Sequence, residues 1–180
     1  ELALRTHLPA ADGLAVDVLV DGAHAPGQIP LNLTELGADI YVGACHKWLM
    51  APKGSAFLYA HPEVQARLDP LVISWGYQPK PGFGSGHTFI DYHEWQGTRD
   101  MSAFLSVPAA IDYHEQHQGQ MIRDRCCRLA RAARREINTM MGLPPLCPSD
   151  GNWFRQMFAV RLPPIDLPAV KQRLYDHYRI

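Results

Sequence analysis

Three short apolar runs follow one another in the first third of the chain, and their lengths limit the possible folds more than any other feature. They are "AVDVLVD" at 15–21, "ADIYVGAC" at 38–45 and "GSAFLYA" at 54–60. Each run is long enough for a strand and short for a helix. The first two are almost continuously apolar, as strands buried on both faces of a parallel sheet are. The pattern predicts an α/β fold with a mainly parallel sheet.

Helical and irregular signals follow these runs. A loop with one short helical turn is expected between the first two strands, and Pro62 has the place of a first helical residue in "PEVQARL". The stretch 74–99 is rich in glycine, proline, histidine and aromatic residues, which predicts a long irregular segment. Asp100 can then cap a helix that runs to about His117.

The last third of the chain predicts a helix, a strand and a second helix. Apolar side chains recur three or four residues apart over 120–141, at Ile122, Cys126, Leu129, Ala133, Ile137 and Met140. "RQMFAVRLP" at 155–163 is typical of a strand, and "LPAVKQRLYDHY" at 167–178 of a helix. We therefore expect one domain over residues 1–118 and the beginning of a small α+β domain over residues 119–180.

Composition and charge narrow the class of protein. Of the 180 residues, 47% are hydrophobic and 19% are charged, which is the balance of a folded globular chain. The net charge of −1 gives no reason to expect a nucleic-acid or membrane partner. The four cysteines include the adjacent pair Cys126 and Cys127, which does not indicate a disulfide framework, so we expect a cytoplasmic protein.

Polar residues follow two of the predicted strands. Asp21 ends the first run and Lys47 follows the second, and in open α/β sheets this edge faces the ligand crevice. Asp21 before Gly22 is also an ordinary turn signal, and the dipeptide alone favours that role. In "GACHKWLMAPKG", Lys47 is either a partly desolvated amine that can attack a carbonyl group or a surface lysine beside Trp48. His24 either contacts a ligand or only satisfies its own loop.

Together these segments form an ordered pattern that is more specific than any one of them. "VDGAHAPGQIPLNLTELGADIYVGACHKWLMAPKG" at 20–54 resembles the class V aminotransferase family of pyridoxal-phosphate (PLP) enzymes, and within it the isopenicillin N epimerase-like branch. "WQGTRDMSAFLSVPAAIDY" at 95–113 and "QMFAVRLP" at 156–163 extend the resemblance. It implies fold type I, with residues 1–118 as the C-terminal half of the PLP-binding large domain and 119–180 as the beginning of the small domain.

The resemblance also implies a role for each candidate residue. Lys47 would form a Schiff base with the aldehyde of pyridoxal 5′-phosphate. Asp21 would pair with the pyridine nitrogen and keep it protonated, so that the ring accepts electrons from the substrate's α-carbon. His24 would contact the ring hydroxyl, and His46 would lie near the phosphate. The catalytic set is then Lys47, Asp21 and His24.

A shared cofactor site is implied as well. Gly97 and Thr98 match a Gly-Thr pair that reaches the cofactor phosphate of the neighbouring subunit, which implies a homodimer. A hydroxyl and exposed backbone N–H groups suit an anion. Relatives commonly carry Ser or Asn where this chain has Ala44, so we expect one phosphate hydrogen bond to be missing. Only twenty residues precede Asp21, so we expect a piece of a longer protein or of a larger assembly.

The function expected from this resemblance is that of a PLP-dependent enzyme. It would act at the α-carbon of an amino acid or an amino-acid-derived amine, by transamination or by epimerisation, which the sequence does not separate. One alternative is a cysteine desulfurase-like enzyme, which needs a nucleophilic cysteine on a mobile loop. Cys126 and Cys127 lie on a predicted helix and Cys147 in a linker, so none is well placed. The other alternative is a non-catalytic fragment that lacks a complete cofactor site.

Two residue clusters suggest further interpretations. Cys45 beside His46, and His114 near His117, invite a metal site, but no cluster has the spacing of a strong zinc motif. Arginines recur over residues 123–135, yet at about 100° per residue they occupy the half of the helix opposite its apolar stripe. That arrangement is typical of a solvated helix face, so we expect neither a metal ion nor a nucleic-acid partner.

Overall fold

The computed structural model describes residues 16–150 and 153–180, which form two compact units divided between His117 and Gln118. The division lies beside the domain boundary that the sequence predicts. That the two units are the large and small domains of the resembled family stays a prediction. Each unit is described separately below.

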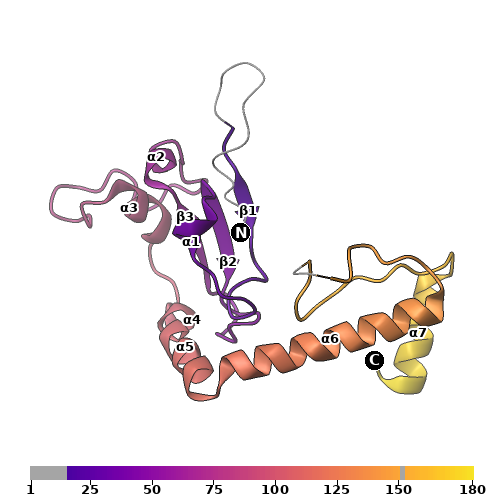
Figure 1. The fold of residues 1–180 in the computed structure, drawn as a ribbon. Coiled ribbons are helices and arrows are strands. Elements are labelled where there is room, and N and C mark those ends of the chain that lie inside the picture. The colour runs from indigo at the N-terminus through magenta and orange to yellow at the C-terminus, as the bar shows by residue number, and fades with distance from the viewer. Residues whose placement is uncertain (1–15, 151–152) are drawn as a thin grey trace. The chain divides into compact units, whose positions relative to one another are not determined.

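A three-stranded sheet in the order β1-β2-β3 forms the centre of the first unit (Figure 1). β1 (Leu19–Asp21) pairs in parallel with β2 (Ile40–Ala44), and β2 pairs antiparallel with β3 (Ala56–Ala60). The predicted strands are therefore present, but the described sheet is mixed rather than mainly parallel. The loop over 45–55 that joins β2 to β3 is too short for the crossover that a parallel neighbour requires.

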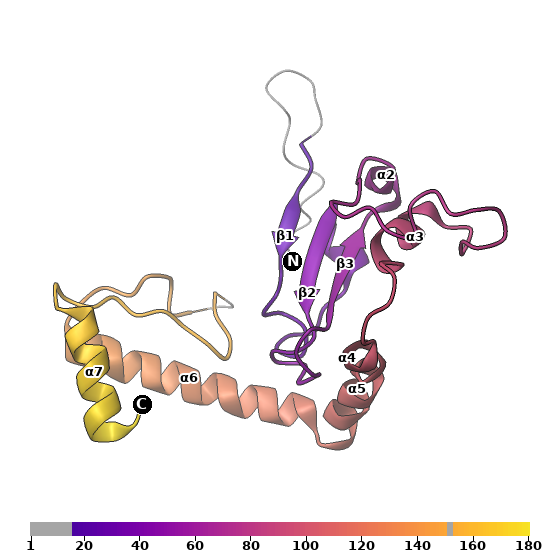
Figure 2. The ribbon, with the colours of Figure 1, turned by 180° about the vertical axis from the view of Figure 1, so that it is seen from behind.

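Burial differs between the central strand and the outer two. Tyr41 and Ala44 on β2 are 2% and 6% exposed. On β1, Leu19 is 59% exposed, so the expectation that this strand is buried on both faces is wrong for the described residues. Figure 2, seen from behind, shows β2 between its two neighbours and β1 at the outer edge of the sheet.

Short helices follow β1 and β3, as the sequence predicts. α1 (Leu33–Leu36) begins after Asn32, whose side chain accepts the Glu35 N–H. α2 (Pro62–Gln65) begins at the predicted proline, and the amide of Gln65 donates to the Ala60 carbonyl at the end of β3, at 2.9 Å. These contacts satisfy backbone groups that a helix end or a strand end would otherwise leave open.

The stretch 74–99 is not irregular throughout, because it contains α3 (Thr88–Glu94). The buried carboxylate of Asp91, 6% exposed, accepts the Ser85 N–H and so fastens the preceding loop to this helix. The ring of His93 packs on Phe89, one turn earlier, with ring centroids 4.6 Å apart. These contacts are specific to the folded loop, and helical periodicity in the sequence does not reveal them.

The helix expected from Asp100 to His117 is present but interrupted. The N-cap position is Met101 rather than the expected Asp100, but the carboxylate of Asp100 accepts the Ser102 N–H at 2.8 Å, and this hydrogen bond lowers the pKa of Asp100. α4 (Ser102–Leu105) ends before Ser106, and α5 (Val107–Gln116) follows. Pro108 explains the break, because proline has no N–H to donate to the preceding turn.

The second unit contains α6 (Gly119–Met141) and α7 (Leu167–Tyr178), which confirms both predicted helices. Residues 155–163 form no strand in the described chain, so that prediction is wrong here. A strand exists only through its pairing, and no described segment pairs with these residues.

One arginine of α6 departs from the expected solvated face. Arg134 is 3% exposed, and its guanidinium donates to the Cys147 carbonyl and to the Ser149 hydroxyl. The same group lies 4.5 Å from the centre of the Phe154 ring. Arg134 therefore holds the segment after α6 against the helix, a role that amphipathic periodicity cannot distinguish from solvation.

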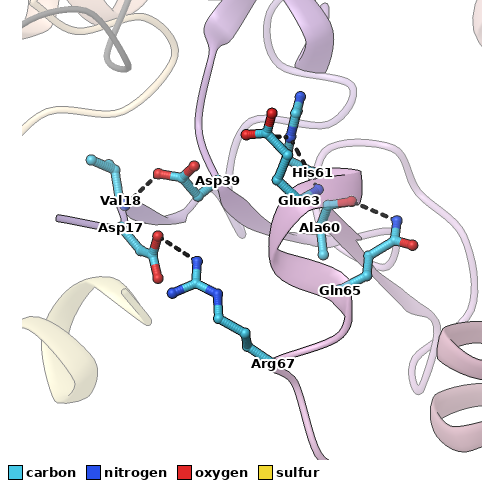
Figure 3. Close-up of polar contacts among 8 residues, drawn as sticks. All are labelled: Asp17, Val18, Asp39, Ala60, His61, Glu63, Gln65 and Arg67. Carbon is cyan, nitrogen blue, oxygen red and sulfur yellow. Dashed lines mark hydrogen bonds and ion pairs between the residues drawn. The ribbon is translucent and has the colours of Figure 1, made fainter. Parts of the chain in front are cut away.

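A group of polar contacts lies at the end of the sheet where β1 and β2 begin (Figure 3). Asp39, 5% exposed, accepts the Val18 N–H at 2.8 Å. Nearby, Arg67 forms an exposed ion pair with Asp17 at 2.7 Å. Buried and solvent-exposed pairs differ in their effect on stability, because only the buried acceptor leaves an unsatisfied donor when it is removed.

We predict that Asp39→Ala lowers the free energy of unfolding by roughly 1–3 kcal/mol, because the Val18 N–H loses its buried acceptor. Asp39→Asn keeps a carbonyl oxygen and should lose less. Asp17→Ala, which removes only the exposed pair, should change little. Urea unfolding of the protein that contains this chain measures all three, and equal stability of Asp39→Ala and Asp17→Ala would contradict the prediction.

At the opposite end of the sheet two loops pack against each other. The first follows β1 over residues 22–28, and the second follows β2 over residues 45–55. A Cβ atom added to Gly27 would lie 2.5 Å from the backbone of Trp48 and Leu49. Gly27 also has a φ of +79°, a conformation that favours glycine. The close approach of the two loops therefore depends on glycine at this position.

Gly27→Ala and Gly54→Ala form a matched pair that tests this contact. Both glycines have positive φ, at +79° and +96°, but a Cβ on Gly54 would meet nothing within 4 Å. Gly54→Ala should therefore lower the free energy of unfolding by roughly 1 kcal/mol, the conformational cost alone. Gly27→Ala should lose more and should speed amide hydrogen exchange in both loops. Equal losses in the two variants would mean that the loop contact does not require glycine.

Candidate active site

Asp21 is the last residue of β1, and its side chain is exposed at the end of the sheet where β1 and β2 finish. One carboxylate oxygen accepts the Ala23 N–H at 3.1 Å, which is an Asx turn. The Gly22 N–H donates to the Val42 carbonyl and so continues the β1–β2 pairing by one residue. The structural role that the Asp-Gly dipeptide suggests is therefore present, and the second carboxylate oxygen accepts no hydrogen bond from the described residues.

Tyr41 supports this turn from β2. Its hydroxyl donates to the Gly22 carbonyl at 3.3 Å, and the ring is almost fully buried. Burial, and secondarily the negative charge of Asp21, raise the pKa of Tyr41. The phenol therefore stays neutral and keeps its donor, which fixes the backbone directly after Asp21. Sequence analysis missed this residue, because a tyrosine in a strand carries no sign of its partner across the sheet.

Lys47 lies in a closed loop directly after β2. The Met50 N–H donates to the Lys47 carbonyl at 3.1 Å, and the Ala51 N–H donates to the Cys45 carbonyl at 2.9 Å. Met50 adopts a φ of +65°, which is unusual for a residue with a side chain. The lysine is half-buried, and its amine makes no hydrogen bond or ion pair within the described residues. An amine that is not engaged in a hydrogen bond or an ion pair can act as a nucleophile toward a carbonyl group.

His24 contacts the residue after the lysine. The indole N–H of Trp48 donates to Nδ1 of His24 at 3.2 Å, which links the 22–28 loop to the lysine loop. The Trp48 carbonyl in turn accepts a hydrogen bond from Nε2 of His114 on α5, at 3.1 Å. The sequence singled out Trp48 only as a neighbour of Lys47, and a contact across 24 positions leaves no local signal.

His46 is exposed, and its Nδ1 lies 3.4 Å from the Ser55 carbonyl, an acceptor that the Cys45 N–H also uses. Ser55 is fully buried and donates to the Pro52 carbonyl. His46 is thus oriented by the loop that carries it. Ala44 is buried beside this loop, and the missing phosphate hydrogen bond expected at its position stays a prediction.

Gly97 and Thr98 lie after α3, and the structure gives no contact between them and the lysine loop in its described part. Gly97 has a φ of +85°, and Thr98 is exposed. The structure therefore places Asp21, His24 and the Lys47 loop together at the end of the sheet where β1 and β2 finish. Gly97 and Thr98 are apart from this group. None of the roles expected for these residues is tested by the geometry alone.

An amine, a carboxylate and an imidazole together can bind a cofactor that has an aldehyde group and a nitrogen-containing ring. The amine can form a covalent bond with an aldehyde, the carboxylate can hold a proton on a ring nitrogen, and the imidazole can donate to a ring oxygen. Lys47 and Asp21 each keep a polar group that is not used within the described chain. The residues present therefore fit a PLP ring.

Other kinds of site find less support in the described residues. Within residues 16–150 and 153–180, no three His, Cys, Asp or Glu side chains are grouped so that they could hold a metal ion. In the same part of the chain, no helix has both the length and the apolar character that a bilayer span needs. Burial raises the pKa of the Cys45 thiol, which disfavours the nucleophilic thiolate.

Comparisons with known proteins identify the relatives of this chain. Isopenicillin N epimerase of Amycolatopsis lactamdurans is 37% identical over 90% of this chain and 43% of its own length. The same enzyme of Streptomyces clavuligerus is 35% identical over 96% of this chain and 47% of its own length. An L-cysteine desulfhydrase of Arabidopsis thaliana is 31% identical over 71% and 28%. The chain thus spans less than half the length of these relatives.

Solved structures share the fold. A cysteine desulfurase from Thermococcus onnurineus NA1 matches with a TM-score of 0.71 at 22% identity, over 92% of this chain and 41% of that one. A C-DES mutant with glycine covalently linked to its PLP cofactor matches with a TM-score of 0.67 at 23% identity, over 90% and 43%. These likenesses confirm the α/β class of fold type I. The aminotransferase class-V profile matches residues 11–178, and the chain belongs to that family.

Proposed function

We propose that this chain supplies the lysine half of a PLP site in an enzyme that acts at the α-carbon of an amino acid or an amino-acid-derived amine. The observation that carries the proposal is Lys47, a half-buried residue whose amine has no partner among the described residues, at the end of the sheet where Asp21 ends the neighbouring parallel strand. Membership of the aminotransferase class-V family supports it, as does the similarity to isopenicillin N epimerases, whose name describes chemistry at a stereocentre.

Each residue of the group has a distinct task in this proposal. When bound, PLP supplies an aldehyde for the Lys47 amine and an electron-accepting ring for the charge that develops at the substrate's α-carbon. Asp21 keeps a proton on the ring nitrogen through the carboxylate oxygen that the Asx turn leaves open. His24 would donate a hydrogen bond to the ring oxygen, and His46 would help to hold the phosphate. The Lys47 amine, once free, carries the proton that leaves or returns to the α-carbon.

Transamination and epimerisation differ in where that proton returns, and both remain within the proposal. The desulfhydrase relative, at 31% identity, favours elimination as a second candidate reaction. A desulfurase reaction has less support, because it needs an accessible thiolate. Cys45 is buried, and Cys126 and Cys127 are half-buried on α6. Analysis of the products formed from one amino acid distinguishes these reactions.

We further propose a homodimer in the cytoplasm, in which Gly97 and Thr98 reach the phosphate of the partner's site. The exposed Thr98 hydroxyl, which has no hydrogen-bond partner in the described chain, and the positive φ of Gly97 support this assignment. The free cysteines at positions 45, 126, 127 and 147 support a reducing compartment. The substrate is a small molecule, and neither a nucleic acid nor a membrane is part of the proposal.

Borohydride reduction followed by peptide mapping tests the central residue. In the PLP-loaded protein that contains this chain, the reduced cofactor should be found on Lys47, because this residue is half-buried and its amine is not paired with any residue that the structure describes. Lys53 and Lys80 are exposed and serve as internal controls. Lys53→Ala should keep the label, and Lys47→Ala should lose it. A label on Lys53 or Lys80 in the unchanged protein would overturn the assignment.

Two substitutions of Asp21 separate its charge from its turn. Asp21→Asn keeps an oxygen for the Ala23 N–H but loses the negative charge, whereas Asp21→Ala loses both. We expect both variants to lose α-carbon chemistry by about a hundredfold, or ~2.7 kcal/mol in the activation barrier. The rate of amino-acid turnover with saturating PLP is the measurement. Near-normal turnover of Asp21→Asn would show that the residue is needed only for the turn.

A further inference from the structure

The hydrogen bond between Trp48 and His24 determines which ring nitrogen of His24 carries a proton, a point that the proposed function does not use. An indole N–H can only donate, so its contact with Nδ1 of His24 at 3.2 Å requires that Nδ1 carry no proton. A neutral imidazole has one N–H, which must then be on Nε2. His24 is itself exposed, and among the described residues no other side chain bonds to its ring. Trp48 is therefore the contact that selects its tautomer.

Trp48 is held firmly enough to do this. Its carbonyl accepts the hydrogen bond from Nε2 of His114 on α5, at 3.1 Å. Its backbone lies against Gly27, where even a single Cβ would be too close. The indole thus extends from a backbone segment that is fixed on both sides, and the 22–28 loop that carries His24 is packed on the same segment.

We propose that Trp48 is a positioning residue that fixes the tautomer and orientation of His24, so that the site holds an N–H donor at Nε2. This inference rests on the proposed function in one respect: the donor serves the oxygen on the PLP ring. That oxygen is electron-rich, so Nε2–H attracts it, whereas an unprotonated Nε2 would repel it. The tautomer itself is a property of this chain and is present without the cofactor.

Nitrogen-15 NMR of the histidine ring tests the proposal in the protein that contains this chain, freed of cofactor and at alkaline pH, where imidazole is neutral. The His24 signals are assigned by their loss in His24→Asn. In the unchanged protein Nδ1 should have the shift of an unprotonated nitrogen and Nε2 that of a protonated one. In Trp48→Phe, which keeps an aromatic ring but no N–H, the two shifts should converge as both tautomers become populated.

Trp153→Phe is the matched control, because Trp153 is 68% exposed and lies in the other unit. It should leave the His24 signals unchanged. PLP titration adds a second readout: Trp48→Phe should weaken PLP binding about fivefold, the size of one net hydrogen bond, and Trp153→Phe should not. A spectrum of Trp48→Phe in which His24 keeps the shifts of the unchanged protein would overturn the proposal, as would a proton on Nδ1 in the unchanged protein.

Two substitutions of His24 give an independent test should Trp48→Phe fail to fold. The side-chain oxygen of His24→Asn can replace Nδ1 as the acceptor, so the indole N–H signal of Trp48 should stay near its original position. His24→Gln places its amide farther out, near Nε2, and the indole signal should move. An indole signal that is the same in all three proteins would contradict the proposal. Failure of the proposed function is distinguishable, because a missing label on Lys47 leaves these NMR results unaffected.

Discussion

The parallel pairing of β1 with β2 is the constraint on which the candidate site depends. With Asp21 opposite Val42, both strands end at the same edge of the sheet, and the chain leaves each strand there. Hydrogen bonds from Gly22 to Val42 and from Tyr41 to Gly22 fix that edge. The loops that follow must then share a small volume, and Gly27 allows their backbones to touch. For this reason a carboxylate and an amine far apart in sequence lie on loops at the same end of the sheet.

The two ends of the sheet use similar side chains for different purposes. At the end where β1 and β2 begin, the carboxylate of Asp39 is buried and accepts a backbone N–H, which stabilises the fold. At the other end, Asp21 is exposed and Lys47 has no partner within the described residues. Groups left incompletely bonded in an otherwise satisfied structure are where function is expected. The contrast supports the choice of this edge as the site.

Much of the fold could be predicted because its signals are local. The strands, α6, α7 and the proline that begins α2 follow from runs and periodicities within a few residues. The direction of β3 was predicted less well, because it depends on the length of a loop rather than on the strand itself. α3 was missed because loop contacts such as those of Asp91 stabilise it. The strand expected over 155–163 needs a partner that no described segment provides.

The candidate site was predictable in part for the same reason. Asp21 and Lys47 follow recognisable strands, so their residue types and positions pointed to one edge. Trp48 and Tyr41 act through partners on other segments, at His24 and Gly22, and their roles appear only when the chain is folded. The burial of Arg134 is a similar case, because a helical arginine gives no sign of the loop that it holds.

The antiparallel return of β3 has a consequence for the order in which the site assembles. Ala44 and Ala56 are joined only by the 45–55 loop, so β2 and β3 form a hairpin of short sequence separation. The pairing of Asp21 with Val42 closes the longer segment 22–41, and closure of a longer segment costs more chain entropy. Folding of local contacts is faster than folding of distant ones. The hairpin that carries Lys47 is thus expected to form first, and the pairing that brings Asp21 and His24 to the same end of the sheet is a later step on the folding pathway.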